Sequence, residues 1–504
     1  MSIGRTRAIA LSGLAGNLVD IEVDIASGLP ALVIIGLPDA SLGEAKDRVR
    51  SAITNSGCTM PPTRVTVNLS PASLPKHGSA FDLGIAMAVL AGSGEVSAES
   101  VAATVHLGEL ALDGRVRPIA GVLPAVVAAR EAGVRRVMVP AGNRAEAELV
   151  TGIDVVAVPS VRHALVAHGA DVEVGDVEVL TAASDDGDVV SERDLADVVG
   201  QSDVVDALIV AAAGRHHLYM LGTPGAGKTM LAERLVDILP DLTPTESLEV
   251  TSIASLSRVA HTQRLITRPP FEAPHHTATT VSVVGGGSGV IRPGAVSRAS
   301  RGVLFLDEAP EFSPAVIDSL RQPLESGEIV IHRSHHVARF PAHVHLVLAA
   351  NPCPCGQAGV SDSDCGCTPD RKRRYRSRIS GPVLDRIDIH LPVRRVARAR
   401  LLDDFEPRVT SMEARRRVVV ARAAATSRWG DSPPPSIALR TGEFRLAAAV
   451  TAPLDTALDR GAVSMRGYDR ALRIAWTLAD LDGATTPTRD HVGRAFTLRK
   501  GLTP

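Results

Sequence analysis

Short apolar runs alternate with alanine-rich helical stretches over the first part of the chain. The runs are rich in β-branched side chains, which favour strands, and they cover 18–25, 31–35, 65–69, 137–140 and 155–158. The stretches 44–55 and 81–91 have the apolar spacing of helices. This alternation predicts an α/β domain over residues 1–170.

A second strand–helix alternation runs from residue 194 to about 395, where it gives way to helical spacing alone. Helices are predicted over 411–428, 444–450 and 468–481. The stretch 171–193 is acidic and rich in small residues without a period, which is typical of a linker. We therefore expect a second α/β domain over 194–395 and a helical lid over 396–504.

Length and composition fit a soluble protein of several domains. The 504 residues exceed the roughly 250–300 that one hydrophobic core usually supports. No apolar run approaches the roughly 20 residues that span a bilayer, and the N-terminus lacks the layout of a secretory signal. We expect a cytoplasmic protein without membrane contact. Because 54 basic and 56 acidic residues nearly cancel, nucleic acid would have to bind through local basic patches.

A glycine-rich phosphate-binding motif follows the apolar run 217–221. It consists of Gly222, Thr223, Pro224, Gly225, Ala226, Gly227, Lys228 and Thr229, and helical spacing resumes over 230–239. Glycines let backbone N–H groups approach phosphate oxygens, and the following helix N-terminus favours their charge. Lys228 would reach the β- and γ-phosphates of ATP, and Thr229 would hold Mg²⁺. A chance match is improbable in this strand–loop–helix context.

Two further runs end in the polar residues that a nucleotide-hydrolysing site needs. The apolar run 302–306 ends in Asp307 and Glu308. Asp307 would complete the Mg²⁺ shell, while Glu308 would polarise the attacking water. Asn351 follows the apolar run 346–350, from where it could reach the γ-phosphate or that water. A turn asparagine before a proline is the structural alternative for Asn351.

Segments around these motifs resemble the bacterial YifB/ComM group of magnesium-chelatase-like AAA+ ATPases. The segments are Asp-Val-Val-Gly-Gln at 197–201, Ala-Pro-His-His at 273–276, Val-Gly-Gly-Gly-Ser at 284–288, Asn-Pro-Cys-Pro-Cys-Gly at 351–356 and Leu-Asp-Arg-Ile-Asp at 384–388. The likeness covers nearly the whole chain, and it implies an AAA+ P-loop core followed by a helical lid.

The resemblance assigns further residues to the nucleotide site. It implies that Arg386 is an arginine finger acting on the neighbouring subunit, and that Arg466 is a lid arginine at the phosphates. Residues 197–201 would border the adenine. A surface ion pair is the alternative for Arg466. Because a finger acting between subunits requires an assembly, the resemblance predicts a homo-hexameric ring, promoted by ATP or DNA.

Two insertions are expected to contact the substrate. The stretch 271–294 contains a glycine run too flexible for a core element, and 328–333 with 336–340 reads as a hairpin. In the resembling clade both face a central pore. The hairpin carries His332, Arg333, His335, His336 and Arg339, a basic set suited to phosphate contact or to simple solvation. With only 3% aromatic residues, base-stacking platforms are not expected, so DNA would be held mainly by its backbone.

Four of the five cysteines form two C-x-C pairs. Cys353, Cys355, Cys365 and Cys367 could close a tetrahedral Zn²⁺ site, and in a reducing compartment metal is favoured over disulfides. Cys58 stands alone and should simply pack. The run 371–378 then places six positive charges around one tyrosine, which is either a solvated surface or a contact for DNA or a neighbouring subunit.

The first domain resembles the fold of Lon-type proteases through its segments 75–87 and 108–116. A Lon-type protease requires a serine–lysine dyad. Asp82 stands where the serine belongs and Leu123 where the lysine belongs, so proteolysis is not expected. A docking or DNA-channel module is the better interpretation.

Three functions fit this sequence. The resemblance implies an ATP-driven helicase or translocase for DNA branch migration in recombination or natural transformation, acting on branched or single-stranded DNA. The alternative is a magnesium-chelatase-type motor subunit that remodels a partner protein. A chaperone-like ATPase is the third. ATP turnover with and without DNA would separate them.

Overall fold

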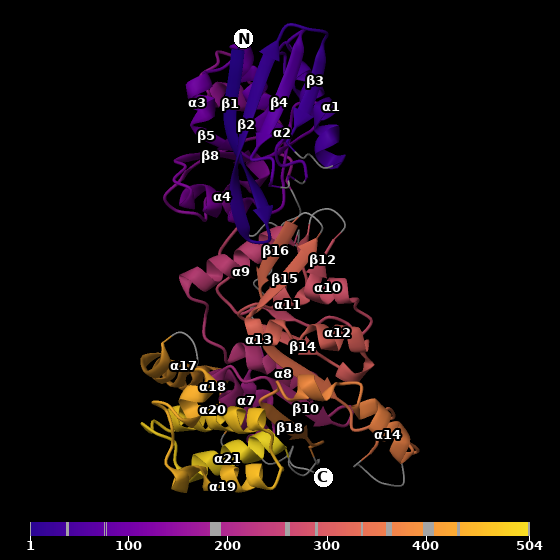
Figure 1. Ribbon diagram of the computed structural model, residues 1–504, viewed down its shortest axis with the longest axis vertical. Coiled ribbons are helices and arrows are strands. Elements are labelled where there is room, and N and C mark those ends of the chain that lie inside the picture. Colours follow the sequence, from indigo (N-terminus) through magenta and orange to yellow (C-terminus); the bar gives the residue numbers. More distant parts are fainter. Residues whose placement is uncertain are drawn as a thin grey trace.

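Three parts follow one another along the long axis of the molecule (Figure 1). The computed structural model describes residues 2–36, 40–74, 76, 78–181, 193–257, 263–287, 291–333, 336–358, 365–396, 408–430 and 434–501. Residues 182–192 of the predicted linker, the glycine-run residues 288–290 and the hairpin residues 334–335 lie outside these ranges. The first residues of the predicted lid, 397–407, also lie outside them.

The N-terminal part is built on a seven-stranded sheet in the order β3-β4-β2-β1-β5-β8-β9. Its strands are β1 (Ser2–Ser12), β2 (Ala15–Ala26), β3 (Ala31–Ile35), β4 (Arg64–Ser70), β5 (Thr104–His106), β8 (Arg136–Pro140) and β9 (Asp154–Val158). The helices α1 (Ala40–Asn55), α2 (Asp82–Ser93) and α4 (Val122–Glu131) pack on it. Residues 82–92 of α2 are all buried.

The long strand β1 is absent from the prediction because its polar positions hide its period. Its two arginines are separated by the polar Thr6, and on the exposed face Arg5 pairs with Glu22 and Arg7 with Asp20 of β2. These cross-strand ion pairs lie on the face that is exposed to solvent, while Ala8 and Ala10 are buried on the other face. The strand is therefore half-buried.

The central part holds a five-stranded parallel sheet in the order β11-β14-β17-β10-β18. Its strands are β10 (Leu218–Gly222), β11 (Phe271–Glu272), β14 (Val303–Leu306), β17 (His345–Ala350) and β18 (Ile389–Val393). The expectation that the whole stretch 271–294 lies outside the core is wrong at its start. Phe271 stacks on Phe305 and pairs with β14, which makes β11 the edge strand of the core sheet.

The C-terminal part is helical, as predicted, although one predicted helix is misplaced. The helices are α17 (Ser411–Trp429), α18 (Ser436–Arg440), α19 (Ala448–Asp459), α20 (Met465–Leu481) and α21 (Arg489–Lys500). The predicted helix 444–450 is correct only over its last three residues, because α19 begins at Ala448, whereas Phe444 lies before it and packs its ring edge-on against both Trp429 and Trp476. Its apolar spacing therefore reflects anchoring of a loop in the core.

None of the helices in the described ranges is long and apolar enough to cross a membrane.

The N-terminal part contacts the central part through the turn between β1 and β2. Gly13 forms an isolated bridge to Arg339 of β16 (His336–Pro341), which pairs with β15 (Glu328–Arg333) as the predicted hairpin. Leu11 and Leu14 pack in one apolar cluster with Phe340. One side of this hairpin is thus covered by the N-terminal part, beside which it lies in Figure 1.

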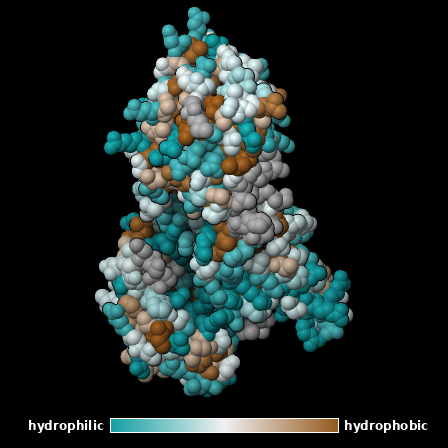
Figure 2. All heavy atoms as spheres, turned by 45° about the horizontal axis from the view of Figure 1, so that its top comes forward, coloured by the Kyte–Doolittle hydropathy of each residue, from teal (hydrophilic) through white to brown (hydrophobic). Residues whose placement is uncertain are grey.

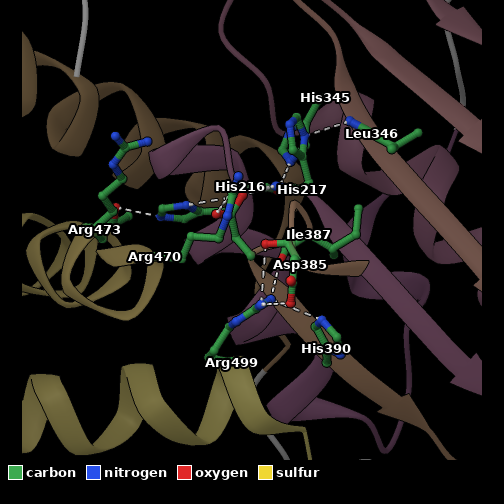
Figure 3. Close-up of polar contacts among 12 residues, drawn as sticks. His216, His217, His345, Leu346, Asp385, Ile387, His390, Arg470, Arg473 and Arg499 are labelled. Atoms are coloured by element: carbon green, nitrogen blue, oxygen red, sulfur yellow. Dashed lines mark hydrogen bonds and ion pairs between the residues drawn. The ribbon is translucent and has the colours of Figure 1, made fainter. Parts of the chain in front are cut away.

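A buried polar network ties the C-terminal helices to the parallel sheet (Figure 3). Asp388, just before β18, accepts the backbone N–H of His217 at 2.8 Å and a guanidinium N–H of Arg470 from α20. Arg499 from α21 donates to the carbonyl of Ile387. His217 Nδ1 in turn accepts the N–H of Leu346 at 3.2 Å. Asp388 therefore links the helical lid to the sheet, and it lies only two residues after Arg386.

Because this network contains buried neutral histidines, the free energy of unfolding should fall as the solution becomes acidic. Burial lowers the pKa of His216 and of His217 to about 4, with the charge of Asp388 opposing the shift. Unfolded histidine has a pKa of about 6.5, so between about pH 6.5 and 4 the unfolded chain binds more protons. We expect the stability contributed by the neutral histidines to be complete above about pH 6.5 and lost as pH falls to about 4.

The variant His216→Gln tests this, because an amide can replace the 2.8 Å hydrogen bond to Thr477 Oγ1 but does not titrate. Denaturant unfolding between pH 4 and 7 gives the free energy of unfolding as a function of pH. The slope of this dependence should correspond to about one fewer proton bound on unfolding in the variant than in the wild type. An unchanged slope in a folded variant would show that His216 does not titrate on unfolding.

Candidate nucleotide site

Three neighbouring strands deliver the predicted nucleotide-binding residues to one edge of the sheet. Strand β17 lies between β10 and β14, and all three run parallel. The glycine-rich loop follows β10, Asp307 follows β14 and Asn351 follows β17. Because parallel strands end at the same edge, residues far apart in sequence meet there.

The glycine-rich loop is closed around the ammonium group of Lys228. Lys228 Nζ donates to the carbonyls of Gly222 (2.7 Å) and Thr223 (3.1 Å), and to Asn351 Oδ1 at 3.0 Å. Gly227 has φ +92° directly before helix α8 (Lys228–Asp237), a conformation that favours glycine. Burial lowers the pKa of Lys228, and the nearby charges of Asp307 and Glu308 oppose this shift. The lysine thus points where phosphate would lie at the helix N-terminus.

The residues predicted to hold Mg²⁺ are in contact. Thr229 Oγ1 donates to Asp307 Oδ2 at 3.0 Å, so a hydroxyl and a carboxylate meet beside Lys228. Oxygen ligands of this kind suit Mg²⁺, which usually keeps several waters and binds substrate phosphates. The donor set therefore fits ATP with Mg²⁺, whose chemistry would be to bridge the phosphates and neutralise their charge.

Glu308 has an unusual, left-handed backbone conformation. Its φ is +50°, and its N–H donates to Asp307 Oδ1 at 2.9 Å. Left-handed non-glycine residues carry a conformational cost and concentrate at functional sites. Glu308 is half exposed, which leaves its carboxylate accessible to a water.

His276 lies at the site, although its sequence pattern did not predict a role for it. Its Nδ1 lies 3.6 Å from Glu308 Oε2, and its ring packs at an angle of 35° against that of His275, with centroids 4.1 Å apart. The available signal was the Ala-Pro-His-His segment at 273–276, which carried the family resemblance without a role. His276 therefore lies within ion-pair distance of the Glu308 carboxylate when its ring is protonated.

The segment expected to border the adenine lies on the loop as well. Gln201 donates its side-chain N–H to the carbonyls of Ala226 (3.2 Å) and Arg394 (2.8 Å). Asp197 pairs with Arg234 of α8 at 2.8 Å. These contacts attach residues 197–201 to the glycine-rich loop and to the end of β18.

Arg386 and Arg466 meet at one carboxylate of their own chain. Arg386 Nη2 lies 2.6 Å from Glu325 Oε1, and Arg386 Nη1 donates to the Pro382 carbonyl. Arg466 Nη2 lies 3.4 Å from the same Glu325 oxygen. Among the described residues, their polar partners are thus Glu325 and Pro382 rather than the loop. The structure places the two arginines together but not at the phosphate site of this subunit.

The four clustered cysteines come together directly after Asn351. All four Sγ atoms lie within 4.8 Å of one another. Cys58 lies apart, half-buried against the N-terminal core, as expected of a packing residue.

In the N-terminal part, the residues at the positions of the protease dyad are structural. Asp82 is fully buried and binds Arg48 through two hydrogen bonds of 2.6 and 3.1 Å. Leu123 is fully buried in an apolar cluster. Lys76 is also buried and donates to the backbone carbonyls of Gly36 and Leu69 at 3.1 Å. These side chains hold the fold together and do not form a nucleophile with its base.

A parallel sheet with this loop, this aspartate–glutamate pair and this asparagine defines a P-loop nucleoside triphosphatase. Comparison with known families narrows the class. The family described as "Magnesium chelatase, subunit ChlI" matches residues 194–401, "Subunit ChlI of Mg-chelatase" matches 21–143, and "Magnesium chelatase, subunit ChlI C-terminal" matches 408–499.

Relatives extend over the whole chain. Competence protein ComM of Haemophilus influenzae is 36% identical over 99% of this chain and 98% of its own length. The uncharacterized protein YifB of Escherichia coli is 37% identical over 99% and 97%, and an uncharacterized protein of Mycobacterium tuberculosis is 49% identical over 99% of each. The chain belongs to the YifB/ComM family of magnesium-chelatase-like AAA+ ATPases.

The fold class follows from these findings together. A 158-residue stretch is 30% identical to a Lon protease of Citrifermentans bemidjiense, covering 29% of this chain and 19% of that protein. The chain therefore combines a Lon-like α/β domain, an AAA+ P-loop core and a C-terminal helical lid. Family membership implies that it uses ATP and Mg²⁺.

Proposed function

We propose that this protein is a cytoplasmic, ring-forming ATPase that moves along DNA and drives branch migration in recombination or natural transformation. One structural observation carries the proposal. Strand β17 joins the β15–β16 hairpin at one end to Asn351 at the other, beside Lys228. A change at the phosphates can therefore be passed along one buried strand to a hairpin rich in basic residues.

The residues would share the work as follows. The loop 222–229 binds the phosphates, and Thr229 and Asp307 hold Mg²⁺. Glu308, oriented by His276, takes a proton from the attacking water, and Asn351 positions that water or the γ-phosphate. Arg386 leaves Glu325 and acts as an arginine finger on the nucleotide of a neighbouring subunit. Arg466 would have to leave the same carboxylate to act as a lid arginine at the phosphates, since its contact with Glu325 is the surface ion pair that was the alternative.

The likeness to a competence protein supports DNA as the substrate, while the magnesium-chelatase family descriptions favour an alternative motor that remodels a protein partner. ATP turnover separates the two. With forked, four-way or single-stranded DNA, assembled rings of a DNA motor should turn over ATP faster than without it. Turnover indifferent to all three DNAs, in rings shown to be assembled, would favour the chelatase-type motor.

The hairpin offers a matched pair of variants for the DNA contact. Arg333 is the last residue of β15 and pairs with His336 next to the turn, whereas Arg339 lies further from the turn, opposite Val330. Arg339 is also paired with Glu328 at 2.8 Å, so its charge is already partly balanced within the hairpin. We expect Arg333→Ala to weaken DNA binding much more than Arg339→Ala.

The measurement is DNA affinity against salt concentration. The logarithm of the DNA binding constant should fall linearly with the logarithm of the salt concentration. Arg333→Ala should make this slope shallower by about one for each DNA phosphate that the variant no longer neutralises, because fewer counterions are released. DNA-free ATP turnover should stay unchanged. Equal DNA binding by Arg333→Ala and the wild type at all salt concentrations would show that the end of the hairpin does not contact DNA.

A further inference from the structure

The described residues 353–358 and 365–367 of the cysteine loop, which carry the four clustered cysteines, lie between the end of β17 and helix α14 (Pro369–Arg376). They start two residues after Asn351, and Cys367 is followed by Thr368, the N-cap of the basic helix α14. Arg376 Nε of α14 donates back to the Pro352 carbonyl at 3.3 Å. Helix α14 projects from the body of the molecule in Figure 1, and the lobe on the same side of Figure 2 is largely hydrophilic.

The loop also packs on the phosphate-binding loop itself. A Cβ added at Gly356 would lie 2.6 Å from both Cδ and Cγ of Pro224, and Gly356 has φ +77°. Only glycine allows the chain to approach so closely in this conformation. The position of the cysteine loop therefore fixes one wall of the phosphate site.

The sulfur positions match a single tetrahedral ion. Cys353 Sγ lies 3.3 Å from Cys355 Sγ and 3.8 Å from Cys365 Sγ, and the latter two sulfurs are 3.7 Å apart. Zn²⁺ with Zn–S bonds of about 2.3 Å would hold its four sulfurs about 3.8 Å apart. Thiolates on the separate irons of a cluster would be spread more widely, and bonded sulfurs of a disulfide would be at about 2.05 Å.

We propose that Cys353, Cys355, Cys365 and Cys367 bind one structural Zn²⁺ that braces the nucleotide site. Cys353 is fully buried and Cys367 nearly so, which shields the ion on one side. With all four positions filled by thiolates, the site is closed and therefore structural rather than catalytic. The ion would hold together the end of β17, the wall of the phosphate site at Pro224 and the start of α14.

Metal analysis of the full-length wild-type protein, purified without chelator, tests the site without any variant. We expect about one zinc per chain. Cys58→Ser should keep this zinc, because Cys58 lies apart from the cluster, whereas Cys355→Ser, at the exposed corner, should lose most of it. Substoichiometric zinc, stoichiometric iron, or oxidised thiols in the wild-type protein would overturn the proposal.

The bracing role rests on the proposed ATPase function and has its own readout. Zinc-free Cys355→Ser should still fold, shown by its circular dichroism, and turn over ATP several-fold more slowly than Cys58→Ser. Gly356→Ala should keep its zinc and also slow turnover, because its new Cβ displaces Pro224. Full ATP turnover in both variants would refute the brace, whereas zinc-loaded wild-type protein without ATPase activity would instead refute the proposed function.

Discussion

Replacing Glu308 with Gln should stop ATP turnover while leaving ATP binding intact. The amide cannot take a proton from water, and general-base catalysis typically contributes about 10²–10⁴ in rate. The phosphate loop, Thr229 and Asp307 are unchanged, so nucleotide affinity should remain and assembled rings should accumulate. Lys228→Ala should instead lose ATP binding, because its ammonium, held within the phosphate loop by the Gly222 carbonyl, would pair with the β- and γ-phosphates.

The measurements are ATP binding and ATP turnover on the same preparations. Glu311→Gln is a matched control, since Glu311 lies one turn further on and pairs with Arg378 at 2.9 Å. It should hydrolyse ATP like the wild type. Turnover by Glu308→Gln equal to that of the wild type would reject the water-activating role.

Local motifs made the nucleotide site predictable. Residues 222–229 follow one strand and open one helix, and Asp307 and Asn351 each end an apolar run, so short segments specify both geometry and chemistry. The parallel sheet then brings the three strand ends together. The cysteine cluster was predictable for the same reason, because its spacing in sequence is short.

Contacts between distant segments were not predictable from these patterns. Nothing near His276 indicates that it meets Glu308, and nothing near Arg386 indicates that Glu325 holds it. The packing of the β1–β2 turn on β16 likewise depends on how two domains dock. Spacing identifies an element, whereas its neighbours are fixed by the whole fold.

Arg386→Ala should bind ATP normally yet hydrolyse it roughly a thousandfold more slowly, as fingers in other nucleotide hydrolases suggest. Arg386 contacts Glu325 and Pro382 in its own chain, so its loss leaves the local phosphate site unaltered. Arg386→Lys should not restore the rate, because an ammonium lacks the planar fork of donors. Rings must be shown to assemble for each variant, because Arg386 is only 7% exposed and its removal also alters packing.

If each nucleotide site is completed by the neighbouring subunit, mixing two inactive variants should restore ATP turnover. Neither Lys228→Ala nor Arg386→Ala rings should turn over ATP. In mixed rings, a subunit with Lys228 meets a neighbour with Arg386 at about a quarter of the interfaces after random one-to-one assembly in a head-to-tail ring. We predict that ATP turnover recovers in verified mixed rings. Turnover no higher than that of either variant alone would contradict a site shared between subunits.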